Sequence, residues 1–150
     1  GADAPSSAVL LLSWSGVCIK MKKYGRKTRD IVFFSAKNQT TLCVHTSQAR
    51  RYAKLLEEDT RIRSYEVNHP LDAAWIARID RVGIRGAYLQ TQWTTDFIIT
   101  DQDGREAVRE IVTADLLGKH AEIEKLELSR RYWKARGVED WRLVLTGEGE

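Results

Sequence analysis

The sequence predicts a mixed α/β fold, and three observations support that prediction. Short runs of β-branched and aromatic residues, separated by turn residues, fill the first third of the chain. Two longer stretches, residues 47–59 and 115–136, carry apolar residues at helical spacing. Between them, two β-type runs flank an Asp-Gly turn, which is typical of a hairpin. This order favours a mixed sheet with a helix on each side and a β-rich N-terminal part.

The N-terminal part contains four β-type segments separated by turn residues. They are residues 8–14, 17–21, 30–35 and 41–45. Each is rich in β-branched, aromatic or other apolar residues, so each is expected to form a short strand.

The first helix is expected over residues 47–59, with the hydroxyl of Ser47 capping the first free amides. Residues 61–68 alternate loosely enough for a strand. Pro70 should end that strand, because proline has no N–H to donate to a sheet ladder. Residues 72–80 fit either a strand or a short helix.

The central hairpin is expected from residues 94–100 and 107–113, which flank the turn at Asp103 and Gly104. These two segments should form adjacent antiparallel strands.

The last part of the chain combines a long helix and a strand. The helix is expected over residues 115–136, with Gly137 just beyond its end as a C-terminal cap. Residues 141–146 should form the last strand. The terminal residues 1–7 and 147–150 are expected to be frayed.

Length and composition indicate one domain over residues 1–150, with its core at about residues 25–146. The chain is 43% hydrophobic and 30% charged, as in ordinary globular domains. Its longest apolar run, residues 8–14, is far shorter than the roughly 20 residues that cross a bilayer. The run also lacks the basic start of a signal peptide, so we expect a cytoplasmic protein without a membrane span. In a reducing compartment, Cys18 and Cys43 should be buried free thiols, and neither is expected to bind zinc.

Positive charge is concentrated in one short segment. The net charge is +3 and the sequence pI is about 8.9, so the chain is only mildly basic overall. The concentrated residues are Lys20, Lys22, Lys23, Arg26, Lys27 and Arg29. Such a segment can follow a phosphate backbone and release its counterions, which predicts DNA binding without sequence reading. The alternative is a solvated turn between two strands.

Three segments of the sequence resemble one protein family. Residues 124–133 read EKLELSRRYW, residues 95–98 read TDFI, and residues 69–71 read HPL. Their spacing resembles the TnsA-type endonuclease domain of heteromeric transposases, within the PD-(D/E)xK restriction-endonuclease-like superfamily. The resemblance covers roughly residues 25 to 146.

The resemblance implies a restriction-endonuclease-like sheet and Mg²⁺-assisted cleavage of phosphodiesters. In this family a helix Glu, an Asp on the first hairpin strand and a Gln or Glu on the second organise the metal. A Lys two residues after that Gln or Glu helps to activate the attacking water. Converging carboxylates hold a hard cation against a phosphate.

Only two of the four implied positions keep their chemistry here. Asp96 and Glu110 match the two hairpin carboxylates and are the candidate metal ligands. Arg50 stands where the helix Glu belongs, and Val112 where the Lys belongs. The permanent positive charge of an Arg repels a divalent ion, and Val cannot ionise, so the resemblance implies a degenerate site.

Several substitutes for the lost groups are conceivable. Lys119, His120 or Lys125 could replace the lysine, and Glu57 or Glu58 the helix carboxylate, although Glu57 would lie roughly 10 Å too far along the helix. We expect instead that Arg50 pairs with Asp96 where the metal would otherwise sit.

Among the tryptophans, Trp93 is the one that could face DNA, because it directly precedes the strand that carries Asp96. The others are expected to fill the core or its rim.

Three functions remain open on the sequence. The first is a cleavage-deficient nuclease-fold protein that binds DNA or a transposase-like partner. The second is an active endonuclease with a rearranged centre that uses Mg²⁺. The third is a structural or assembly protein, and a homo-oligomer is compatible with each.

Overall fold

The computed structural model describes residues 29–147, and the segments expected at residues 8–14 and 17–21 lie outside them. So do five of the six clustered basic residues, all except Arg29. The strands are β1 (Ile31–Ser35), β2 (Thr40–Val44), β3 (Ile62–Pro70), β4 (Thr94–Asp101), β5 (Glu106–Thr113) and β6 (Asp140–Thr146). The helices are α1 (Ser47–Glu58), α2 (Ala73–Ile76), α3 (Gly86–Leu89) and α4 (His120–Ala135), with a 3-10 turn, η1 (Ala114–Leu116), before α4.

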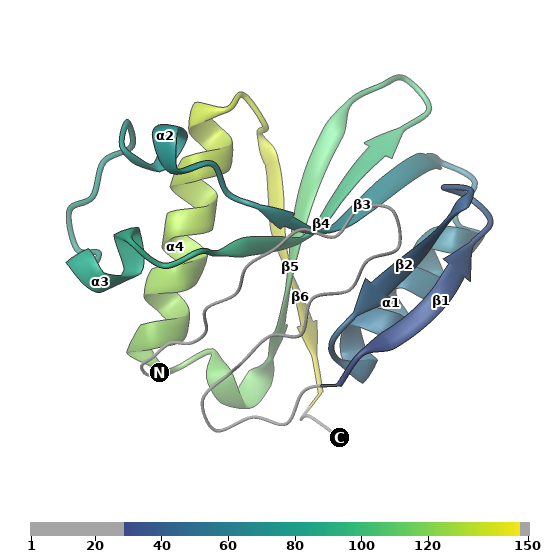
Figure 1. Cartoon of the computed structure of the whole chain (residues 1–150), viewed down its shortest axis with the longest axis horizontal. Helices are drawn as coiled ribbons and strands as arrows, with labels where there is room; N and C mark the ends of the chain where they lie inside the picture. The colour runs from purple at the N-terminus through teal and green to yellow at the C-terminus, as the bar shows by residue number, and fades with distance from the viewer. Residues whose placement is uncertain (1–28, 148–150) are drawn as a thin grey trace.

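The strands form two sheets, as Figure 1 shows. β1 and β2 make an antiparallel hairpin, and the larger sheet has the order β3-β4-β5-β6. The pairs β3–β4 and β4–β5 are antiparallel, whereas β6 runs parallel to β5. The parallel pair is possible because α4 carries the chain back to the start of the sheet between β5 and β6. The expected mixed α/β fold with helices flanking the sheet is confirmed.

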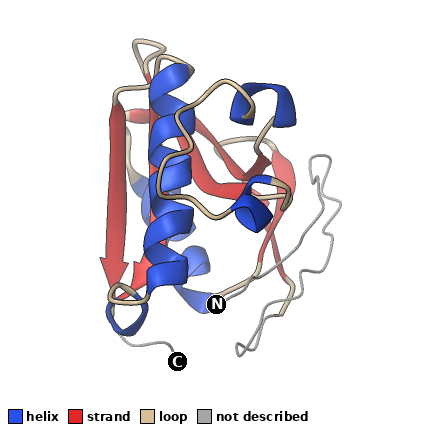
Figure 2. Ribbon diagram, turned by 90° about the vertical axis from the view of Figure 1, so that its left-hand side faces the viewer, coloured by secondary structure: helices blue, strands red, loops and turns tan. Residues whose placement is uncertain are grey.

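Each face of the four-stranded sheet is covered by a different layer (Figures 1 and 2). α4, with α2 and α3 beside it, covers one face. The hairpin β1–β2 and α1 lie on the other side. Neighbouring side chains of a strand point to opposite faces, so Ile98 packs toward α4 and Phe97 toward α1.

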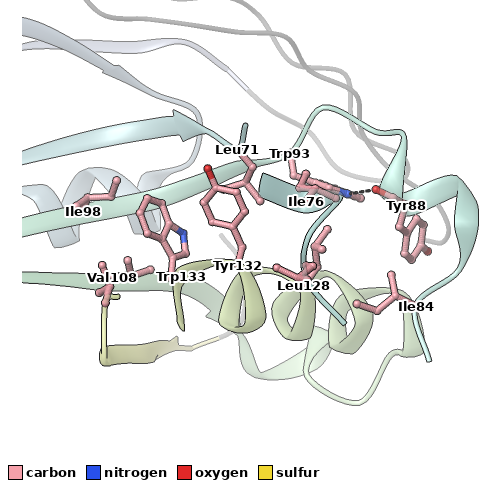
Figure 3. Close-up of a cluster of buried hydrophobic side chains, with 12 residues drawn as sticks. Leu71, Ile76, Ile84, Tyr88, Trp93, Ile98, Val108, Leu128, Tyr132 and Trp133 are labelled. Carbon is pink, nitrogen blue, oxygen red and sulfur yellow. Dashed lines mark hydrogen bonds between the residues drawn. The ribbon is translucent and has the colours of Figure 1, made fainter. Parts of the chain in front are cut away.

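Aromatic rings of α4 dominate the core on its side of the sheet. Figure 3 shows Tyr132 and Trp133 of α4 packed between the helix and the strand residues Ile98 and Val108. Tyr132, Leu128 and Val108 are fully buried. The hydroxyl of Tyr132 accepts a hydrogen bond from the backbone N–H of Asp72, which ties the start of α2 to α4.

The observed elements differ from the expected ones mainly at their ends. Thr46 rather than Ser47 caps α1, and its hydroxyl accepts from the N–H of Ala49 at 3.1 Å. The long helix begins at His120 instead of residue 115, because the chain first makes η1 and then passes Gly118, a weak helix former. Gly137 ends the helix in the left-handed conformation, with φ of 89°, as expected for a C-terminal cap.

Within residues 29–147, none of the helices has the length and apolar character that crossing a membrane requires.

Candidate functional site

Asp96 and Glu110 lie together where β4 and β5 leave each other. The paired register of these strands ends at Phe97 and Arg109, so the next residues along, Asp96 and Glu110, stand opposite each other. The hairpin turn thus brings together two carboxyl groups that are fourteen residues apart in the sequence.

Each of these carboxyl groups bonds to the backbone of the opposite strand. Asp96 Oδ2 accepts from the N–H of Ile111 at 2.7 Å, and Glu110 Oε1 accepts from the N–H of Asp96 at 3.1 Å. Buried amides need an acceptor, and where the ladder ends these side chains provide it in place of backbone carbonyls. The pair therefore has a structural role at the point where the strands separate.

Glu110 is more deeply buried than a metal ligand of an open site would be. Its side chain is 2% exposed, and its Oε2 accepts from the hydroxyl of Ser129 at 2.5 Å. Ser129 in turn accepts from the indole N–H of Trp141 at 2.9 Å. Burial, together with the charge of Asp96, raises the pKa of Glu110 to about 8. The carboxyl group is therefore mostly protonated at neutral pH.

Lys125 is the one suggested substitute cation whose charge acts on this pair. It lies one helical turn before Ser129 on α4, and its charge opposes the rise in the pKa of Glu110. Its Nζ is 5.8 Å from the ring centroid of Trp93. Lys119 and His120, by contrast, are exposed at the start of α4.

The expected ion pair between Arg50 and Asp96 does not form. The guanidinium of Arg50 lies 4.0 Å from the ring centroid of Phe33 in β1, and its buried Nη1 has no hydrogen-bond partner among residues 29–147. The helix that carries Arg50 packs against the β1–β2 hairpin, so the side chain stacks there. Arg50 thus does not fill the position of a metal beside Asp96.

Glu57 does not replace the missing helix carboxylate either, because it ties α1 to neighbouring elements. It accepts hydrogen bonds from the hydroxyls of Ser35 and Tyr65, both at 2.5 Å, and from the N–H of Lys37 at 3.1 Å. Partial burial raises the pKa of Glu57, but the hydrogen bonds from Ser35 and Tyr65 outweigh it and the net shift is downward. Glu58, the other suggested residue, is exposed.

Two further positions from the sequence are buried. Val112 is 2% exposed, and the structure therefore uses it as a core residue where the family has a lysine. Trp93 is 7% exposed and donates its indole N–H to the carbonyl of Tyr88 at 2.7 Å (Figure 3). The suggestion that this ring faces DNA is wrong, because the ring is buried in the core under α4, with an edge-type contact to Tyr88.

The carboxylate pair is a poor fit to Mg²⁺, which binds several oxygens in octahedral geometry. Three of the four oxygens of Asp96 and Glu110 already accept hydrogen bonds from the protein. Among residues 29–147, no third carboxylate, histidine or cysteine joins them in a group of three ligands.

One group of three donors does occur, on the β1–β2 hairpin. A ligand atom from each of Asp30, Cys43 and His45 lies within 4.8 Å of the others. Asp30 and His45 also form an ion pair at 3.3 Å. Cys43, however, is disulfide-bonded, so its sulfur is not available as a thiolate ligand. The expectation of a free thiol is wrong for this residue.

Sequence reasoning did not single out Ser129 and Trp141, which hold Glu110. The available signal was the spacing of four residues between Lys125 and Ser129, which places both on one face of α4. No sequence pattern indicates the contact with Trp141, since it depends on the parallel pairing of β6 with β5.

No protein-family model matches the sequence, and a search of curated proteins finds no match.

Proposed function

We propose that this chain is a TnsA-like nuclease-fold protein that binds DNA, or a transposase-like partner, without cutting DNA. The support from the sequence is the three family-like segments at compatible spacings and the basic segment that includes Arg29. The support from the structure is a mixed sheet that brings Asp96 and Glu110 together with no third ligand among the described residues.

The state of Glu110 is the observation that carries the proposal. A carboxyl group that is 2% exposed, accepts hydrogen bonds through both oxygens and has a pKa raised by burial cannot readily hold a hard dication. Binding a metal there would require Glu110 to lose its proton and the metal to compete with the donors from Asp96 and Ser129. Because α1 carries Arg50, stacked on Phe33, at the position of the family's glutamate, that position offers no further carboxylate to bind the metal.

The test for cleavage is a nuclease assay on supercoiled and linear DNA with Mg²⁺ or Mn²⁺. We expect no nicking above that of the Asp96→Ala variant, because the parent chain holds no productive metal. Robust cleavage that Asp96→Ala abolishes would overturn the proposal. Glu106→Ala removes an exposed carboxylate four residues before Glu110 on β5 and is the control for general effects on the preparation.

The test for binding compares two variants that each remove four positive charges. One replaces Lys20, Lys22, Lys23 and Arg26 with serine; the other replaces the exposed Lys54, Arg63, Arg81 and Lys134. We expect the first variant to weaken DNA binding and to reduce its salt dependence, because counterion release scales with phosphate contacts. Equal losses in both variants would indicate only a net-charge effect. Absence of salt-dependent binding by the parent chain would favour a transposase-like partner or an assembly role.

The location of Lys125 favours one second function, an endonuclease with a rearranged centre. Its charge acts on Glu110, on the pair that the family uses for catalysis. If this function is correct, cleavage should appear in the nuclease assay and Lys125→Met should abolish it. Lys119→Met, six residues earlier and exposed, should leave the rate unchanged.

A further inference from the structure

Among the described residues, the two edge strands of the four-stranded sheet differ in how many neighbours they have. Next to β3, the β1–β2 hairpin supplies hydrogen bonds: Asn38 Oδ1 accepts from the N–H of Tyr65 at 2.8 Å. Asn68 on β3 donates to the carbonyl of Cys43 at 3.0 Å. β6 is the opposite edge, and within residues 29–147 it pairs with β5 alone. No other strand among residues 29–147 pairs with its outer backbone groups, and such an edge can pair with another strand.

The side chains of β6 are unusually apolar for an exposed edge. Trp141 packs against the core under α4, so the alternation of the strand places Leu143 and Leu145 on that same side of the sheet. Leu143 is 38% exposed and Leu145 is 57% exposed. Natural edge strands are usually protected by charge, and here the only charges are Asp140 and Arg142 near the start of the strand.

We propose that β6 is a self-association surface, on which β6 of a second copy of this chain pairs in antiparallel orientation about a two-fold axis at Leu143. When the two-fold axis is perpendicular to the sheet, the numbers of every two paired residues add up to the same value. The rotation also leaves each side chain on the same face of the sheet as before. The two four-stranded sheets then form one continuous sheet across the dyad.

The order of residues in β6 selects this register. With Leu143 on the axis, Trp141 faces the partner's Leu145 and Arg142 faces the partner's Val144. The apolar residues on the α4 side then meet each other, and no like charges are opposed. If the axis passed through Arg142 instead, the arginines of the two copies would lie opposite each other. An axis at Val144 would place Trp141 opposite Gly147 and lose its apolar contact.

The experiment measures the oligomeric state of the full chain by sedimentation velocity over a range of concentrations. We expect a concentration-dependent dimer for the parent chain. Leu143→Lys places two ammonium groups at the axis and should raise the dimer Kd by about tenfold or more. Leu55→Lys makes the same substitution at a residue of α1 that is 61% exposed, and it should leave the Kd unchanged.

The register has its own test at Val144. Val144→Glu places a carboxylate opposite the partner's Arg142 and should lower the dimer Kd, whereas Val144→Lys opposes two cations and should raise it. Circular dichroism of each variant verifies that it is folded. Equal effects of the two substitutions would overturn this register.

Two results would overturn the surface itself. One is a dimer whose Kd Leu143→Lys does not change. The other is a monomer at all concentrations, whatever the exchange rates of the β6 amides. Neither result bears on cleavage or on DNA binding, so this inference and the proposed function can fail separately.

Discussion

At the scale of single residues, the candidate site is defined by the hydrogen bonds that two carboxyl groups accept. Asp96 and Glu110 accept hydrogen bonds from backbone amides that the separating strands leave without a ladder partner. Ser129 on α4 donates to Glu110, and Trp141 on β6 donates to Ser129. Burial and the neighbouring carboxyl group of Asp96 raise the pKa of Glu110, and the hydrogen bonds from Ser129 and Asp96 offset only part of that rise.

The raised pKa of Glu110 predicts an unusual pH dependence of stability. The folded chain keeps the proton up to a pH of about 8, whereas the unfolded chain releases it near the ordinary value of 4.5. Between these values the folded state binds more protons, so the free energy of unfolding falls as the pH rises, by at most about 1.4 kcal/mol per unit. Glu110→Gln cannot ionise, and we expect it to remove this slope.

The measurement is urea unfolding of the parent chain and of Glu110→Gln at intervals from pH 5 to pH 9. The variant should gain stability relative to the parent chain as the pH increases. Glu106→Gln changes an exposed carboxylate on the same strand and should keep the slope of the parent chain. A slope that Glu110→Gln retains would contradict the assignment.

The sequence predicted that Asp96 and Glu110 lie opposite each other, but it did not predict the contacts of the other site residues. Two strands joined by a tight turn have a register that can be counted along the chain, and this places the pair. The position of Arg50 depends on how α1 packs against β1, where Phe33 offers an aromatic face. Contacts of that kind join distant segments and leave no local pattern in the sequence.

At the scale of elements, α1 is a helix with one buried face and one solvated face. Ala53 and Leu56 pack on Phe97 and Val67 of the sheet, while Leu55, the neighbour of Leu56, is 61% exposed. Rotation by about 100° per residue separates these two adjacent leucines. Tertiary packing of the buried face therefore provides most of the stability of this twelve-residue helix.

The adjacent leucines provide a matched pair of substitutions. Leu56→Ala leaves a cavity in the core and should lower the free energy of unfolding by about 3 kcal/mol. Leu55→Ala removes the same atoms from the solvated face and should change it by less than about 0.5 kcal/mol. Chemical denaturation of both variants is the measurement. Similar losses for the two would mean that α1 is rotated relative to this description.

Elements with a strong local signal were predicted well, and those without one were not. Runs of β-branched and aromatic residues and the turn at Gly104 determine β4 and β5, whose observed bounds lie within one residue of the expected ones. Residues 72–80 were ambiguous because α2, the helix within them, is only four residues long, and the equally short α3 was not predicted. Packing of Ile76 and Tyr88 against α4 stabilises them, and so short a helix has little periodicity of its own.

At the scale of the whole molecule, one sheet carries two hydrophobic cores. The core under α4 includes Ile98 and Val108, and the core under α1 includes Phe97 and Ile99. Consecutive residues of β4 thus contribute to both. The number of layers followed from the order of elements, but the split into two sheets did not, because a hairpin can either extend a sheet or pack on its face.

Sharing of the central strands predicts that the two cores unfold together. Trp75, Trp93, Trp133 and Trp141 all belong to the core under α4. Replacing Trp14, the fifth tryptophan of the sequence, with phenylalanine in every variant restricts the fluorescence signal to that core. Leu56→Ala perturbs the other core, yet we expect it to lower the midpoint of thermal unfolding seen by tryptophan fluorescence and by far-ultraviolet circular dichroism to the same extent. Losing Phe97 from the α1 core also loosens Ile98 in the other, so neither core can melt alone. Leu128→Ala, in the core under α4, should likewise shift both signals equally. A fluorescence midpoint that stays in place when Leu56→Ala lowers the dichroism midpoint would show that the two cores are separate folding units.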